Sequence, residues 1–598
     1  MIIHNSLNQM ASDRFKTKTT GVIRLKRGII SFISIILLGM VLSACALNSS
    51  SSKETSESKS KKVDNVAGVV STESKKYEAT DLLALPDKAK ARKDTFIAGI
   101  SAPGGVFLPY FYENGWDGNA TDPVFAPLVN LDEEGKPVGI LAENWDVSDD
   151  QLTYTFHLRK NLKFSDGTPL TADDVAFTLT LLHDPAYAGY QDISLAAIKG
   201  GKDYKEGKSK SIEGIKVIDP TTIEITTEKV NAKSLLLLGG QILSKAYYGK
   251  DYQYGKLDYL KDLYSKPMGA GPYKFEKYVP GQEIRYEANE NYYAGKPKTK
   301  HLIYKIIDST TSLQLFETGE LDYAGFSADE DTVEQLKSLG FASIQTGPVN
   351  DFGFIYINNT RPQFKDKEVR QALIYGLDRQ KIVDVKFKGF GQVANVPVSP
   401  VSWAYNDEGV NKYEFNADKA KELLEKAGWK VGSNGIREKD GKKLIIHYLT
   451  SKADDPVIPI AKENYQDIGI KFEPEIMDFN ALVSKLSDKD YDLATVSTSQ
   501  ILDPSDPVEE LATNHPNNSA GYSNPKVDEL IQKGLSTLDI EKRKEIYHEL
   551  YKELGKDPAF ILVHYRQSAK AISGQIEGLN PDNYTGISSS LPNISIKK

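Results

Sequence analysis

Cysteine is the residue type that most constrains this chain, because the 598 residues contain only one, Cys45. A single cysteine cannot form an internal disulfide, so the folded parts must be stabilised by burial of apolar surface. Cys45 ends the run Leu42–Cys45, which closes an apolar stretch over residues 28–44 and follows a cationic cluster over residues 24–27. Charged, apolar and small-residue regions in this order are typical of a secretory signal.

The small residues end at Cys45, where an ordinary cleavage site has Ala-x-Ala, and this pattern resembles a bacterial lipobox. The resemblance implies that residues 1–44 are a lipoprotein signal peptide and that Cys45 is acylated on its thiol. The alternative is a short uncleaved membrane helix, but a span needs roughly 20 apolar residues and this stretch is shorter. Two acyl chains give stable anchoring. We therefore expect the mature protein to be lipid-anchored on the extracellular face of the membrane.

Charge and length narrow the class of protein. Residues 1–44 carry six Lys or Arg and one Asp, so the net charge of −8 becomes −13 once they are removed. An acidic chain is poorly suited to bind nucleic acid, and no nucleic-acid partner is expected. The remaining length is sufficient for two or three domains with cores of their own.

The segment after the cysteine changes in character. Ser49–Ser52 and the Lys/Glu/Ser-rich run that follows contain almost no apolar side chain. Such a composition cannot offset the entropy lost on ordering. We therefore predict a flexible tether over residues 45–93 and a folded body that begins near Asp94. The alternative is a short docked helix formed by Leu82, Leu83 and Leu85.

Strand and helix patterns alternate through the folded body. Thr95–Ile100 is typical of a strand, and Thr153–Arg159 alternates apolar and polar residues as a half-buried strand does. Thr171 stands at the N-cap of a helix whose apolar positions begin at Val175 and follow at i+4 and i+7. Strands that alternate with helices indicate α/β lobes.

Several short blocks then occur in one order along the chain. They are Leu141–Trp145 with Tyr154–Arg159, Phe164–Gly167 and Ala172–Val175; Gly269–Tyr273 with Asn291–Tyr293 and Lys296–Lys298; Val369–Leu373 with Asp378 and Arg379; Ala417–Leu424 with Ala427–Trp429; and Tyr522–Pro525 with Asp528–Leu530. Together they resemble the extracellular solute-binding proteins of family 5, the peptide and nickel receptors of ABC importers. The resemblance covers roughly residues 95–570 and is strongest to oligopeptide-binding lipoproteins of Gram-positive bacteria.

The resemblance implies a two-lobed α/β fold of the periplasmic-binding-protein type, with an extra domain on the first lobe and two hinge crossings. The expected division is lobe I over 94–126, 244–350 and 566–598, the extra domain over 127–243, and lobe II over 351–565. The crossings are expected near residues 349–352 and 565–568.

A receptor for many peptides should hold the backbone as an added strand, bind the ammonium with a carboxylate and leave side chains in wet pockets. The resemblance implies cleft positions at Asn114, Gly115, Trp116, Phe354, Ser499, Gln500, Ile501 and Asp503. Relatives usually carry a tryptophan three residues before the acid that binds the ammonium; here Gln500 takes its place and Asp503 keeps the acid. The alternative for Asp503 is helix capping, and for Asn114, Trp116 and Phe354 it is ordinary packing.

Motifs for enzymatic chemistry are missing from the sequence. It contains no His-Glu-x-x-His and no Gly-x-Ser-x-Gly, and its one cysteine is assigned to the anchor. The histidines show no close ligand spacing, so no metal or other cofactor is expected. We predict a monomeric peptide receptor whose partners are ABC permease subunits and, through them, cytoplasmic ATPases. A peptide-pheromone signalling receptor and a nickel- or haem-binding member of the family are the alternatives.

Overall fold

The computed structural model describes residues 74–597 except 113, 309, 499 and 500. Cys45, the predicted signal peptide and the predicted site residues Ser499 and Gln500 lie outside the described residues. Within the described part, no helix combines the length and the apolar character that a membrane span requires.

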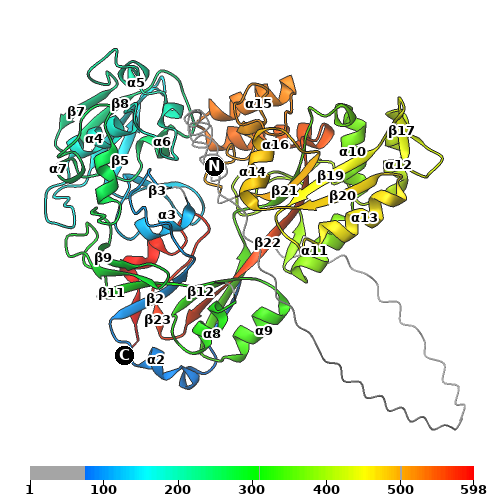
Figure 1. Cartoon of the computed structure of the whole chain (residues 1–598). Helices are drawn as coiled ribbons and strands as arrows, with labels where there is room; N and C mark the ends of the chain where they lie inside the picture. The colour runs from blue at the N-terminus through cyan, green and yellow to red at the C-terminus, as the bar shows by residue number, and fades with distance from the viewer. Residues whose placement is uncertain (1–73, 113, 309, 499–500, 598) are drawn as a thin grey trace, which may run out of the picture. The chain divides into compact units, whose positions relative to one another are not determined.

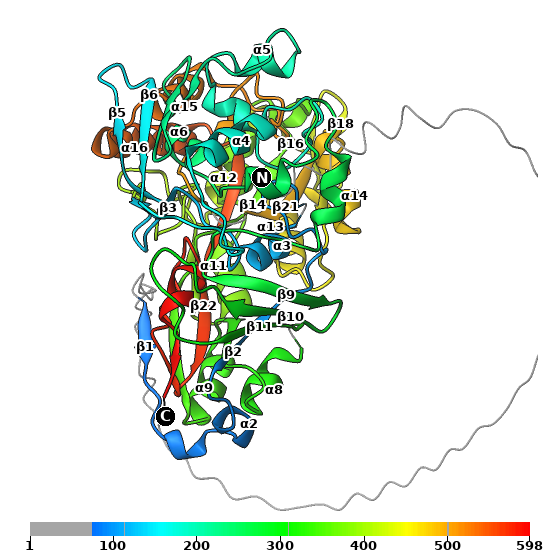
Figure 2. The same cartoon turned by 90° about the vertical axis from the view of Figure 1, so that its left-hand side faces the viewer.

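The first sheet is built around the predicted strand Thr95–Ile100, which the structure confirms as β2. In spatial order its strands are β12 (Tyr323–Ser327), β2, β11 (His301–Ile306), β10 (Glu283–Ala288) and β9 (Tyr273–Val279). β2 pairs in parallel with both of its neighbours, whereas β9 to β11 are antiparallel (Figure 2). Phe96 and Ala98 alternate along β2 and are both buried, as expected for one face of a strand.

The second sheet contains strands from the later part of the chain. In spatial order they are β20 (Lys471–Ile476), β19 (Ile445–Thr450), β21 (Leu493–Ser497) and β14 (Gly353–Ile357). Helices α10 (Lys367–Tyr375), α12 (Ala417–Lys426) and α13 (Val457–Asp467) pack against these strands in one apolar cluster. The predicted helix stripes are confirmed, since Val369, Leu373, Ala420 and Leu424 are all buried in it.

One long strand is shared by both sheets (Figure 1). β22 (Phe560–Ser573) pairs with β14 near its start and with β12 and β13 (Ala342–Pro348) over its second half. The chain leaves the first sheet at the end of β13 and enters the second at β14, so residues 349–352 form the other connection. The predicted crossings fall on these two segments. The result is the mixed α/β, two-lobed architecture that the resemblance implied.

A separate antiparallel sheet is formed by residues that lie between β2 and β9 in the sequence. Its order is β5 (Ala142–Val147), β6 (Thr153–Leu158), β8 (Thr222–Thr226) and β7 (Ile215–Asp219). The predicted helix is α4 (Ala172–Leu182), whose capping box joins Thr171 and Asp174. Val175 and Leu179 are buried, as their spacing predicted. This sheet belongs to the range predicted as the extra domain.

The segment before β2 differs from the prediction of a tether that extends to residue 93. β1 (Lys75–Tyr77) pairs with β13, and the helical turns η1 (Leu82–Ala84) and α2 (Asp87–Lys90) follow. The Arg92 guanidinium lies 2.5 Å from the buried Asp322 carboxylate. The pairing of β1 with β13 and the ion pair of Arg92 with Asp322 hold this segment on the fold, and composition alone predicts neither. Residues 75–93 therefore belong to the folded body and not to a tether, and the docked-helix alternative is closer to the structure.

Candidate functional site

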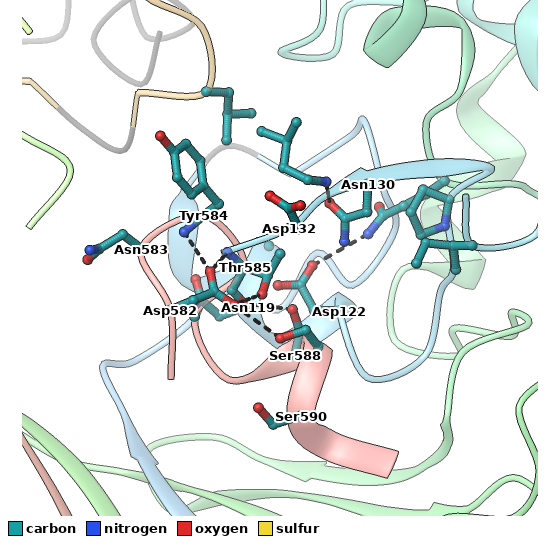
Figure 3. Close-up of a pocket in the computed structure, with 18 of the residues that line it drawn as sticks. Asn119, Asp122, Asn130, Asp132, Asp582, Asn583, Tyr584, Thr585, Ser588 and Ser590 are labelled. Atoms are coloured by element: carbon teal, nitrogen blue, oxygen red, sulfur yellow. Dashed lines mark hydrogen bonds between the residues drawn. The ribbon is translucent and has the colours of Figure 1, made fainter. Parts of the chain in front are cut away.

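A cavity of about 1220 Å³ lies where segments distant in sequence meet. Its walls are formed by α3 (Gly115–Thr121) and the residues after it through β3 (Val129–Leu131) and β4 (Pro137–Gly139), by residues 349–351, by Arg566 and Lys570 of β22, and by residues 578–593. Ligand cavities typically measure about 300–1000 Å³, so this one has room for a ligand of several residues. Figure 3 shows Asn119, Asp122, Asn130 and Asp132 opposite the 582–590 segment.

The 582–590 segment is held in shape by one carboxylate. Asp582 accepts hydrogen bonds from the backbone N–H groups of Tyr584 at 2.7 Å and Thr585 at 2.6 Å. The hydroxyl of Ser589 donates to the same carboxylate at 3.1 Å. Asp582 therefore orders this wall of the cavity.

The cations on the cavity wall already have partners. Arg566 donates from Nε to both carboxylate oxygens of Asp351 at 3.2 and 3.1 Å, next to the first crossing. Lys570 donates to the carbonyl oxygens of Pro581 at 3.1 Å and Asp582 at 3.4 Å. Burial lowers the pKa of Lys570. Through these contacts, Arg566 and Lys570 connect β22 to Asp351 at the first crossing and to residues 581 and 582 of the cavity wall.

Asp122 lines the cavity in a different way. It follows the last turn of α3, and its hydrogen bond with a described residue comes from Gln241 Nε2 at a long 3.4 Å. Burial raises the pKa of its carboxyl group to about 7. Sequence reasoning missed Asp122, because no local pattern marks it; the packing of other segments around it gives it this environment.

Part of the predicted site lies on the cavity. Asn114 and Gly115 are among the lining residues, and Asn114 also caps α3 by accepting from the N–H groups of Trp116 and Asp117 at 3.0 Å. Trp116 is 47% exposed and does not line this cavity. Trp116 is therefore neither packed in the core nor on this cavity wall, and its contact with a ligand stays a prediction, while Asn114 combines capping with a place on the wall.

Phe354 and Ile501 lie off the cavity wall. Phe354 is buried and its ring contacts those of Phe352, Tyr356 and Phe560. Ile501 is buried, and its carbonyl oxygen accepts from Asn350 Nδ2 at 2.5 Å. Their contacts with a ligand stay predictions, and their positions favour a packing role.

Asp503 is held by contacts within the protein. Its Oδ1 accepts from Ser505 N–H at 2.9 Å, from Ser505 Oγ at 2.7 Å and from Arg543 Nη2 at 2.7 Å. Burial alone would raise the pKa of Asp503, but the Arg543 charge and these hydrogen bonds outweigh it and lower the pKa. Asp503 therefore holds a turn and an ion pair, and it does not cap a helix, because the next helical element, η5 (Glu509–Leu511), has Val508 at its N-cap. Leu502, not Asp503, lines the cavity, and the ammonium-binding role stays a prediction.

Lys233, whose side chain is 11% exposed, connects the ranges that were predicted as the extra domain and lobe II. Lys233 Nζ lies 2.7 Å from the Asp506 carboxylate and 2.9 Å from that of Glu509. Burial would lower the pKa of Lys233, but the two carboxylates raise it overall. Beside it, Ala232 N–H donates to the carbonyl oxygen of Leu535 at 2.7 Å. These contacts join segments on opposite sides of the crossings.

Comparison with known proteins places the chain in a family. The model of the bacterial extracellular solute-binding proteins, family 5 Middle, matches residues 136–520. Oligopeptide-binding protein AppA of Bacillus subtilis is 29% identical over 471 residues, which cover 76% of this chain and 83% of that protein. Heme-binding protein A of Haemophilus influenzae is 27% identical over 562 residues, which cover 90% of this chain and 94% of that protein.

A solved structure supports the same assignment. The structure of oligopeptide-binding protein AppA from Bacillus subtilis in complex with a nonapeptide matches with a TM-score of 0.70 at 25% sequence identity. The match covers 85% of this chain and all of that chain. The sequence blocks, the two sheets joined by β22 and the family match agree over most of the folded body. The chain therefore belongs to the bacterial extracellular solute-binding proteins of family 5.

Proposed function

We propose that this protein is a lipid-anchored extracellular receptor that binds peptides in the cavity and delivers them to an ABC importer. The observation that carries the proposal is the cavity of about 1220 Å³ beside both crossings, in a chain of this family. A ligand that touches both lobes there would favour their closure, because two crossings permit a hinge.

The chemistry of the walls favours a peptide over nickel or haem. Backbone amides need donors and acceptors, and the walls offer the side chains of Asn119, Asn130, Gln191, Gln241, Asn580 and Asn583. Among the described residues that line the cavity there is no His, Cys or Met, the side chains that bind nickel or haem iron most readily. The similarity to AppA, whose structure holds a nonapeptide, points the same way.

Titration calorimetry on the purified full chain tests this proposal. Peptides of three, five and nine residues are compared with haem and with the nickel–histidine complex. We expect at least one peptide length to bind, with haem and nickel–histidine much weaker. Saturable binding of haem or nickel–histidine with no response to any peptide would overturn the proposal. Native mass spectrometry of the protein as purified would then identify what it carries.

Delivery to an importer is tested in cells. Loss of the gene should abolish growth on a peptide that supplies an essential amino acid, and the wild-type gene should restore it. Unchanged growth together with altered gene expression would instead support a pheromone receptor.

The anchor is tested at Cys45. Cells that express wild type or Cys45→Ala are labelled with a clickable fatty acid. We expect label on the wild type and none on the variant, because the thiol is the site of acylation. Equal label on both would show that Cys45 is not the lipidated residue.

The role of Asp503 in binding the ammonium also remains a proposal. Arg543 already compensates much of its charge, so a second cation would gain less than at an unpaired carboxylate. If the role holds, Asp503→Asn and N-acetylation of the peptide should each weaken binding, and the two effects should not add. Full additivity would leave Asp503 as a turn residue and an ion-pair partner.

A further inference from the structure

The acidic residues on the cavity wall differ in what compensates their charge. Those described are Asp122, Asp132, Glu133, Glu134, Asp351 and Asp582. Asp351 pairs with Arg566, and Asp582 accepts backbone N–H groups of its own loop. Asp132 accepts from the N–H groups of Glu134 and Lys136 at 2.9 Å.

The two glutamates also have partners. Glu133 accepts from Asn580 Nδ2 at 3.1 Å, and Glu134 forms an ion pair with Lys136. Asp122 differs from the other described lining acids, since its carboxylate is half-buried and accepts one long hydrogen bond, from the neutral Gln241 amide, whereas Glu133, which also has a neutral amide partner, is exposed to solvent. Asp122 also stands at the C-terminal end of α3, where the helix dipole is unfavourable for an anion.

Aromatic rings face the same part of the cavity. Tyr112 and Tyr190 line it and stack with their ring centroids 4.5 Å apart. Their hydroxyl groups share a hydrogen bond of 2.8 Å. Stacked aromatic rings next to a carboxylate attract organic cations through the ring face as well as through charge. This pairing of groups is suited to an ammonium or a guanidinium.

Asp132 and Asp582 lie on the same cavity wall (Figure 3), and four tyrosines that are neutral at ordinary pH interact with Asp122. These tyrosines come from the strands and loops packed around it: Tyr112, Tyr190, Tyr286 of β10 and Tyr304 of β11. Burial raises the pKa of each tyrosine, and the Asp122 charge raises it further. No described Lys or Arg contributes to the pKa of Asp122. Its negative charge is thus left for a ligand to balance.

We propose that Asp122, with Gln241, Tyr112 and Tyr190, forms a subsite of the cavity that binds a positively charged group of the ligand. This inference rests on the proposed function, since the cation would be the N-terminal ammonium or a Lys or Arg side chain of a bound peptide. It gives the receptor a preference for cationic peptides at this position.

The proposed subsite predicts that the affinity for a cationic ligand depends on pH. The carboxylate form binds the cation, and burial raises the pKa of the empty site to about 7. Below pH 7 the ligand must displace a proton, so affinity for a Lys or Arg side chain should fall by about tenfold between pH 8 and pH 6. The fall should be smaller for an N-terminal ammonium, which itself loses its proton near pH 8. A ligand without a cation in the subsite should lack this dependence.

The test compares matched peptides by calorimetry on the purified full chain. Peptides of three, five and nine residues carry one central Lys or its neutral isostere norleucine, each with a free or an acetylated N-terminus. Wild type is compared with Asp122→Asn and with Asp149→Asn, a control at an exposed turn away from the cavity. We expect loss of the relevant cation to weaken wild-type binding at least about tenfold. Asp122→Asn should remove both this preference and the pH dependence, and Asp149→Asn should keep both.

The outcomes identify the cation that the subsite binds and test the subsite itself. If norleucine matters, the subsite takes a side chain; if acetylation matters, it takes the N-terminus. Peptides that bind equally with and without a cation, or an Asp122→Asn variant that keeps the full preference, would overturn the subsite while the peptide receptor stands. If no peptide binds at any length, the proposed function and the subsite both fall. The wild-type pH profile tests the subsite without any variant.

Discussion

Asp503 and Asp122 are both carboxylates inside this protein, and their surroundings are opposite. Asp503 forms an ion pair with Arg543 and accepts two hydrogen bonds from Ser505, and it does not line the cavity. Asp122 lines the cavity and has one long hydrogen bond from a neutral amide. The pKa of Asp503 is lowered by its partner, whereas burial raises that of Asp122.

The difference is that Asp503 has a cationic partner within the protein and Asp122 has none among the described residues. A buried charge that carries its own counter-ion contributes to the folded state, and loss of that counter-ion is costly. A buried charge without one is a burden on folding, and such groups gather at functional sites. The acid predicted from the sequence carries its own counter-ion, and the acid without one is found only in the fold.

The largest expected effect comes from removing the counter-ion of Asp503. Arg543→Met removes the counter-ion and leaves Asp503 buried, which should lower the free energy of unfolding by about 3 to 5 kcal/mol. Urea denaturation followed by fluorescence measures the change. Lys544→Met, which removes an exposed partner of Glu541, is the control and should cost less than about 0.5 kcal/mol. Equal stability of Arg543→Met and wild type would show that Asp503 does not depend on its partner.

Lys233 offers a second compensated charge, between the extra domain and lobe II. Lys233→Met would leave Asp506 and Glu509 facing each other without a cation, and should weaken this contact by about 2 kcal/mol. The radius of gyration of the unliganded chain, from small-angle scattering, should rise. Lys216→Met removes an exposed pair within one sheet and should leave it unchanged. No increase for Lys233→Met would mean that other contacts hold the two segments together.

The smallest expected effect is a gain in the free energy of unfolding, and it comes from substitution of Asp122. Its folded pKa of about 7 lies above its unfolded value near 3.9, so the unliganded protein loses stability as pH rises from 4 to 7. Asp122→Asn removes that loss and should stabilise the unliganded chain at pH 8 by about 1 to 2 kcal/mol, since cavity water offsets part of the burial. The gain should shrink as pH falls to 4. Destabilisation by Asp122→Asn at pH 8 would show that the charge supports the fold.

Local patterns predicted much of the fold. The strand at Thr95–Ile100, the capped helix after Thr171 and the apolar stripe of α10 depend on neighbours a few residues apart, which the sequence displays directly. The two-lobed arrangement came from the order of the family blocks. The start of the folded body was placed too late, because edge pairing of β1 with β13 joins residues more than 250 positions apart.

The site was harder to predict for the same reason. Asp503 was predicted to bind the ammonium of the ligand, a role that stays a prediction, and its partner Arg543 lies 40 positions away with no pattern that links them. Asp122 and Asp582 both line the cavity, and neither local sequence predicts that the other is nearby. Whether a carboxylate is compensated depends on such distant neighbours, which only the folded chain brings together.

The most direct measurement is a crystal structure of the protein with a nonapeptide that carries one central Lys. We predict that the peptide occupies the cavity, that one of its cationic nitrogens lies within hydrogen-bond distance of Asp122, and that Arg543 still pairs with Asp503. A peptide bound outside the cavity, or inside it with every cationic group away from Asp122, would contradict this conclusion.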